Sequence, residues 1–176
     1  ITFKKTTTQT SLTACTLFGF LQLTGNVTFT NCIIGPATLT DASTTARENS
    51  HFQINAHAGR TITFNGCTID GLTSTLVGGY SISKVNAGNT VRFIDSTIEN
   101  IAVNITGNYN HYGGLYFSAG ALVIDNITVN TVAMDHADTA TERLHGPLFV
   151  TTSAATMTVD GVTAARITQT GNAAGA

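Results

Sequence analysis

The sequence predicts an all-β fold, namely a right-handed parallel β-helix (β-solenoid) of about six coils with two longer loop insertions. Three observations lead to this prediction: a repeat of roughly thirty residues, alternation of apolar side chains within each repeat, and a turn-forming residue at a fixed place in it. One repeat is too short to bury its own apolar face, whereas stacked repeats bury a continuous core.

The repeat is visible in six segments that begin at Ile1, Val27, Ile62, Val91, Leu122 and Met157, with spacings of 26, 35, 29, 31 and 35 residues. The first and third positions of each segment are apolar, and alternation with period two indicates a strand with one buried face. The fifth position is a residue that favours bends in five of the six segments: Asn31, Gly66, Asp95, Asn126 and Gly161. Apolar residues return at the sixth and eighth positions, so the chain turns a corner between two strands.

A further strand is expected before each restart, at residues 52–54, 80–82, 115–117 and 148–150. If successive coils stack, Phe29, Phe64 and Phe93 lie in one interior ladder. A β-sandwich would also show many short strands, but it would not repeat one positional code at this spacing. A propeller blade needs four strands in a longer unit, and no segment sustains the 3.6-residue period of a helix.

Composition sets the class of protein. The chain of 176 residues fits one domain, residues 1–176, and only 10% of its residues are charged, with a net charge of -2. The basic surface of a nucleic-acid binder is therefore missing, and no apolar run approaches the ~20 residues of a membrane span. Abundant Thr with low charge is typical of strands whose outer faces are polar but uncharged, which favours an extracellular or cell-surface location.

Two stretches carry a family resemblance. Gly113-Gly114-Leu115-Tyr116 followed by residues 121–126, and Gly78-Gly79-Tyr80-Ser81-Ile82 followed by residues 90–99, resemble the passenger repeats of polymorphic outer-membrane proteins, related autotransporters and large surface adhesins. The resemblance implies a β-helix displayed outside a cell, used for adhesion or as a structural stalk. It carries over no catalytic residue.

Two acidic pairs are the candidates for chemistry. Asp70 and Glu99 occupy the ninth position of successive repeats, and Asp125 and Asp160 the fourth. Carboxylates on adjacent coils can share a cation, so calcium is the one cofactor that Asp70 and Glu99 suggest. The alternative function that follows is a carbohydrate-active β-helix, either like a polysaccharide lyase or carbohydrate-binding. Solvated carboxylates at a coil edge are the simpler explanation of the pairs, and we predict that the chain is not an enzyme.

The two 35-residue repeats contain matched loop insertions that are rich in charged side chains and histidine. Loops on a rigid scaffold usually carry specificity, so these are the expected contacts with a carbohydrate or cell-surface ligand. The residues concerned are Arg47, Glu48, His51, Asp138, Glu142, Arg143 and His145.

Three further features leave alternatives open. Thr dominates the seventh position (Thr7, Thr68, Thr97, Thr128 and Thr163), which suggests ice binding as a third function, although Thr also favours exposed strand positions in general. Asn26, Asn104 and Asn126 each begin an Asn-X-Thr triplet that could accept a glycan. Cys32 and Cys67 share one inward column, as buried thiols or as a disulfide, and Cys15 leaves an odd count.

The ends of the repeat array bear most on function. No amphipathic cap is evident beside Ile1 or after Met157, so a coil at either end would expose a sheet edge and a slice of core. Either the chain is a segment of a longer solenoid, or its ends stack head-to-tail on other copies. The sequence thus predicts a non-enzymatic extracellular structural or adhesive β-solenoid, with self-association into a filament as one form of it.

Overall fold

The computed structural model describes residues 2–4, 11–13, 16–17, 20–23, 26–41, 52–54, 59–76, 83–85, 88–106, 115–117, 120–136, 149–151 and 156–171. Every regular element in these residues is a β-strand, and every strand pair is parallel. No helix long and apolar enough to cross a membrane occurs in this part of the chain.

The strands form three sheets. A four-stranded sheet has the order β1 (Thr2–Lys4), β4 (Phe20–Leu23), β8 (Phe52–Ile54) and β12 (Ser83–Val85), and β15 (Leu115–Phe117) pairs with β17 (Phe149–Thr151). The twelve-stranded sheet contains β2 (Ser11–Thr13), β3 (Thr16–Leu17), β5 (Val27–Thr30), β6 (Ile33–Ile34), β7 (Ala37–Asp41), β9 (Thr61–Asn65), β10 (Thr68–Asp70), β11 (Leu72–Leu76), β13 (Asn89–Ile94), β14 (Thr97–Ile105), β16 (Gly120–His136) and β18 (Thr156–Gly171).

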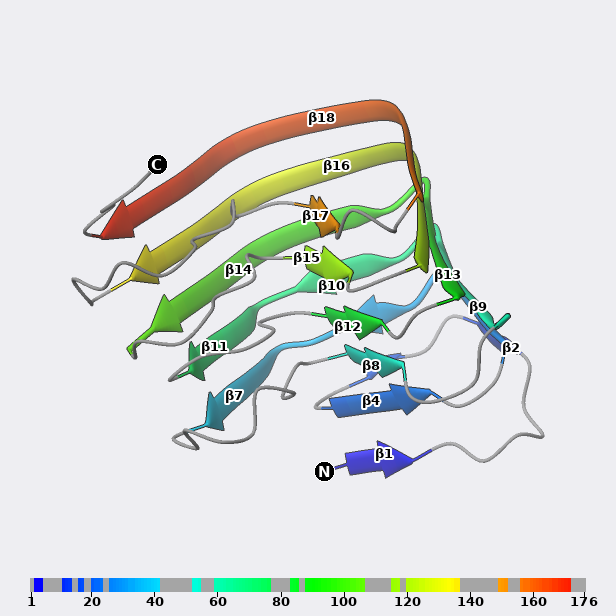
Figure 1. Ribbon diagram of the computed structural model, residues 1–176, viewed down its shortest axis with the longest axis horizontal. Helices are drawn as coiled ribbons and strands as arrows, with labels where there is room; N and C mark the ends of the chain where they lie inside the picture. The colour runs from blue at the N-terminus through cyan, green and yellow to red at the C-terminus, as the bar shows by residue number, and fades with distance from the viewer. Residues whose placement is uncertain are drawn as a thin grey trace.

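The large sheet is curled into a half-barrel, an arrangement compatible with a β-solenoid (Figure 1). Each limb of the half-barrel follows the order of the sequence, with β2, β5, β9, β13 and β16 on one limb and β3, β6, β10, β14 and β16 on the other. β1, β4, β8 and β12 lie across the open side. β15 contacts β12, so the small sheets follow one another along the same direction (Figure 1). Apolar side chains from successive strands fill the space that the curled sheet encloses.

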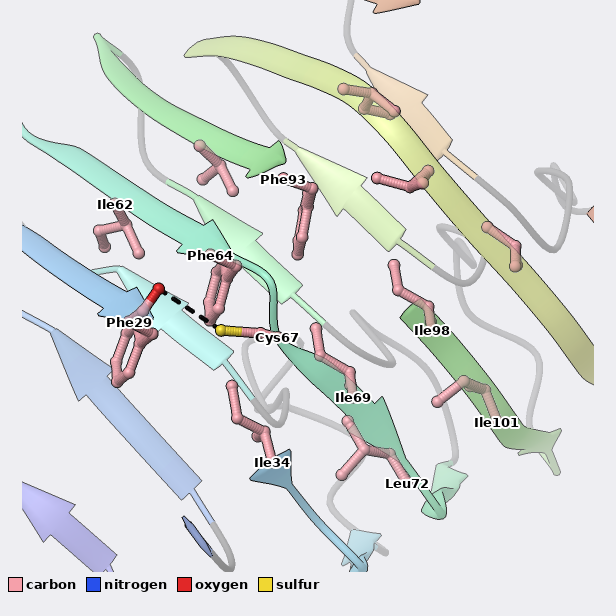
Figure 2. Close-up of a cluster of buried hydrophobic side chains, with 14 of the residues drawn as sticks. Phe29, Ile34, Ile62, Phe64, Cys67, Ile69, Leu72, Phe93, Ile98 and Ile101 are labelled. Carbon is pink, nitrogen blue, oxygen red and sulfur yellow. Dashed lines mark hydrogen bonds between the residues drawn. The ribbon is translucent and has the colours of Figure 1, made fainter. Parts of the chain in front are cut away.

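The aromatic ladder confirms the predicted stacking of repeats. Phe64 is the register partner of both Phe29 and Phe93, and the rings stack with centroids 5.1 and 4.9 Å apart and interplanar angles of 7° and 9°. The three side chains are 0%, 2% and 1% exposed, and Figure 2 shows them in one row. Ile34, Ile69 and Ile98, from the eighth position, form a second row beside it.

The predicted corner at the fifth position is confirmed by the backbone. Asn31, Gly66, Asp95, Asn126 and Gly161 all have positive φ, between 48° and 62°. A second corner, which the sequence analysis did not identify, lies at the tenth position, where Gly71, Asn100, Thr131 and Arg166 have φ between 53° and 69°. Two left-handed residues per repeat turn the strand through both bends of the half-barrel.

The register of the first repeat corrects one prediction. Thr2–Lys4 pairs with Phe20–Gln22 in the four-stranded sheet, whereas the partner of Thr28–Thr30 is Ser11–Thr13. The segment at Ile1 matches the alternation by chance, because its fifth residue, Lys5, does not favour a bend and its sixth, Thr6, is not apolar. The seventh position of this repeat is consequently Thr16, the partner of Ile33, and not Thr7.

One predicted restart strand, at residues 80–82, lies outside the described part of the chain. The strand that pairs with β8 is β12 at Ser83–Val85. The strands predicted at residues 52–54 and 115–117 are confirmed, and β17 begins one residue later than expected.

Candidate self-association edge

The last strand exposes the side of the sheet that β5, β9, β13 and β16 bury. Met157, Val159 and Val162 of β18 are 46%, 50% and 38% exposed. Their register partners on β16 are Leu122, Ile124 and Ile127, which are at most 2% exposed. The three exposed residues occupy inward positions of the repeat, so β18 presents a strip of core to its surroundings.

The difference follows from the number of neighbouring strands. β16 lies between β18 on one side and β13 and β14 on the other, whereas β18 pairs with β16 alone among the described strands (Figure 1). Inward side chains of a parallel stack are covered mainly by the rungs above and below. A strand with one neighbour therefore leaves these three inward side chains 38–50% exposed, while Ile167, further along β18, packs against the core.

β18 lacks two of the features that usually protect a sheet edge, a proline and a charge that points inward. It runs for 16 residues from Thr156 to Gly171 without a proline, and the three exposed inward side chains are all apolar. Edge strands in soluble proteins are commonly short, or carry charges that point inward, because a row of unpaired N–H and C=O groups invites another strand. The edge of β18 is thus suited to pair with one.

The acidic pairs lie where the repeat predicts. Asp70 is the register partner of Glu99, and Asp125 that of Asp160. Asn100 Nδ2 donates a hydrogen bond of 2.8 Å to Asp70 Oδ1, so one oxygen of the Asp70 carboxylate already has a partner. No group of three metal-ligating side chains occurs among the described residues.

The sequon asparagines have three different environments. Asn26 Oδ1 accepts a 2.8 Å hydrogen bond from the Thr61 N–H, and Asn126 Nδ2 donates a 2.6 Å bond to Asp95 Oδ1. Both side chains therefore tie one rung to the next. Asn104 is exposed on β14 between Thr75 and Asp135, which makes it the sequon most open to a glycan.

The sixth-position column contains thiols and one hydroxyl. Cys32 and Cys67 are both reduced thiols and 1% exposed, and Cys67 Sγ lies 3.4 Å from the Phe29 carbonyl to which it donates (Figure 2). Ser96 occupies the same position one rung further on, is 2% exposed, and donates to the carbonyls of Ile94 at 2.7 Å and Phe64 at 3.3 Å. The thiol and hydroxyl side chains at the sixth position thus donate hydrogen bonds to backbone carbonyls near the corner. The prediction of apolar residues at this position did not include that role.

The Thr column is in register but is not uniform. Thr68, Thr97, Thr128 and Thr163 follow one another at the seventh position, while Ile33 in the same column is 49% exposed. Arg92 lies between Thr63 and Val123. The loop candidates Arg47, Glu48, His51, Asp138, Glu142, Arg143 and His145 lie outside the described residues, as does Cys15.

In comparisons with family models, curated proteins and solved structures, the chain matches none of them. The resemblance to surface-displayed passenger repeats therefore stays a prediction from the sequence.

Proposed function

We propose that the chain is a right-handed parallel β-solenoid of six coils with two longer loop insertions, a non-enzymatic structural or adhesive element outside the cell that extends head-to-tail through β18. The observation that carries this proposal is the exposure of Met157, Val159 and Val162 at inward positions. As the occupant of the edge we propose the first coil of a second copy; a further coil of a longer chain, the other alternative, would cover the same strip.

The register at the other end of the sheet supports this occupant. Leu12 occupies the column of Phe29, and Leu17 that of Ile34. Those two columns end at Val159 and Ala164 on β18. A copy added one rung beyond β18 would place its Leu12 on Val159 and its Leu17 on Ala164, so both columns would continue without a change of register.

The energetics require the backbone as well as the side chains. Completing the burial of three side chains that are 46%, 50% and 38% exposed contributes about 2–4 kcal/mol in total. Association itself costs about 4–15 kcal/mol, so the apolar strip alone does not hold two copies together. Hydrogen bonds along the strand supply the remainder, as in other cases of strand addition to a sheet edge.

Electron microscopy and sedimentation of the purified chain test the proposal. We expect fibres with an axial repeat of roughly 29 Å, the height of six rungs. Val159→Lys should abolish the fibres, because it places a charge on the inward side of the edge, whereas Thr158→Lys puts the same charge on the outer side of the same strand and should assemble normally. Discrete particles from the wild-type chain, or equal assembly of the two variants, would overturn head-to-tail growth.

The carbohydrate-active alternative keeps a separate test. Incubation with acidic polysaccharides and calcium, followed by absorbance of unsaturated products, would detect lyase activity. The Asp70–Glu99 and Asp125–Asp160 pairs belong to different strands of the repeat, and Arg92 stands between Thr63 and Val123, so no described base adjoins either pair in its column.

A further inference from the structure

Two buried hydrogen-bond donors lack an acceptor at the bend that leads into the large sheet. Arg60 precedes β9, and Asn89 begins β13. Asn89 is 1% exposed and its Nδ2 has no partner; Arg60 Nε is buried and also has none. These are the buried side-chain donors without a partner in the part of the chain that the structure describes.

The two residues are bonded to each other through other atoms. The Arg60 N–H donates to Asn89 Oδ1 at 3.1 Å, and the Thr90 N–H donates to the Arg60 carbonyl at 2.8 Å. Each lies two residues before an inward residue, Ile62 or Val91, and these two are register partners. Arg60 and Asn89 therefore occupy the same inward position on adjoining rungs.

The next rung adds no side chain at this position. Its residue is Gly120, where a Cβ would clash with the Asn89 carbonyl oxygen. Reversing the Asn89 amide does not remove the unpaired donor either, because Oδ1 is needed to accept the Arg60 N–H. Asn89 therefore keeps one unpaired donor or one mismatched pair in either orientation of its amide.

The missing acceptor should carry negative charge. A buried donor without an acceptor is costly, and native proteins rarely leave one unpaired. Guanidinium and amide N–H groups are donors only, and charge-assisted bonds to an oxyanion are the strongest that they form. A water molecule would also accept a bond, whereas an oxyanion would in addition balance the charge of the half-buried Arg60 guanidinium.

We propose that Arg60 and Asn89 bind a small oxyanion at this bend, with Arg60 Nε and Asn89 Nδ2 as donors. Phosphate, sulfate and carboxylate groups are the oxyanions that fit these donors. A carboxylate ligand is either a free ion or part of an acidic sugar. This site is independent of β18 and does not rest on head-to-tail growth.

Titration calorimetry and thermal unfolding of the full chain at constant ionic strength test the site. The probes are inorganic phosphate and glucuronate, with glucose as the neutral control. We expect saturable binding of at least one of the two anions and a rise in Tm with its concentration. Binding of phosphate alone would identify a free-ion site, and tighter binding of glucuronate an acidic-sugar site.

Three variants make the outcome decisive. Arg92→Met removes the same charge from an exposed position on the outer face of β13 and should bind as the wild type does. Arg60→Met should weaken binding at least tenfold. Asn89→Asp keeps an acceptor for the Arg60 N–H but brings its own carboxylate, so it should also lose anion binding while remaining folded.

Absence of a saturable effect in the wild-type chain would overturn the proposal, because water would then suffice as the acceptor. Equal binding by Arg60→Met and Arg92→Met would do the same. If Arg60→Met does not fold, Asn89→Asp decides: unchanged anion binding in that variant contradicts the site.

Discussion

The middle strands and the last strand share the same alternation of apolar residues, but they differ in how far those residues are buried. Phe64 on β9 and Phe93 on β13 are 2% and 1% exposed and stack on each other, whereas Val159, in the same column on β18, is 50% exposed. Backbone geometry does not explain the difference, since the corner residue has φ 62° at both Gly66 and Gly161. The alternation of apolar residues thus determines which way a side chain points, and the neighbouring rungs determine whether it is buried.

The largest expected effect separates these two roles. Val91→Ala removes two methyl groups from a side chain that is 2% exposed, and we expect a loss of about 2–3 kcal/mol in the free energy of unfolding. Val159→Ala makes the same change at a position that is 50% exposed, and should cost less than about 1 kcal/mol. Urea denaturation followed by circular dichroism, at a concentration where sedimentation shows single copies, measures both.

Equal losses from the two Val→Ala variants in single copies would contradict the comparison. They would mean that something covers β18 within one chain. A loss at Val159 that appears only in the assembled protein would instead sharpen the comparison, because the edge would then be buried by another copy.

Much of the fold could be predicted because it depends on local choices repeated in each coil. The Phe ladder follows from alternation, and the fifth-position corner follows from the preference of Asn, Asp and Gly for positive φ. The tenth-position corner was missed because Thr131 and Arg166 adopt positive φ there without any such preference. Stacking on a rung that already turns imposes this conformation, and a single repeat does not reveal it.

The candidate sites were harder to predict than the fold. The absence of a predicted cap suggested self-association. The position of the exposed strip, however, depends on which strand has a single neighbour, and only the sheet topology shows this. Asn26 carries a glycosylation motif, yet its side chain accepts from Thr61 on the next rung. Arg60 and Asn89 gave no sequence signal because they belong to no motif, and only their burial without acceptors marks them.

An intermediate effect is expected at the corners, where the two regions should behave alike. Gly66→Ala and Gly161→Ala each force a Cβ into the left-handed region at φ 62°, which costs about 1–2 kcal/mol. A Cβ at Gly66 meets Asn31 Oδ1, the end of an exposed side chain that can rotate away, and one at Gly161 approaches Asn126 Cα at 3.2 Å. Similar losses in urea denaturation are therefore expected, and a much smaller loss at Gly161 would show that β18 is only loosely held in its register.

The smallest effect at neutral pH is expected in the sixth-position column, where the middle strands have thiols and a hydroxyl while β16 and β18 have Ile127 and Val162. Cys67→Ser should change the free energy of unfolding by less than about 1 kcal/mol, since Ser96 shows that a hydroxyl finds the same pair of corner carbonyls. Burial raises the pKa of the Cys67 thiol above its usual value, and this effect outweighs the backbone hydrogen bonds that lower it. The folded chain therefore holds this proton more tightly than the unfolded chain, so the stabilisation is complete below the unfolded pKa of about 8.5 and is lost as the pH rises through the folded pKa.

Urea denaturation between pH 7 and 10 should show the wild type losing stability relative to Cys67→Ser across the alkaline part of this range, a comparison in which the shared lysines and tyrosines cancel. Parallel curves for the two proteins would mean that the thiol is not shielded from solvent in the folded chain, and that the enclosed column of the middle strands is as open as the edge at β18.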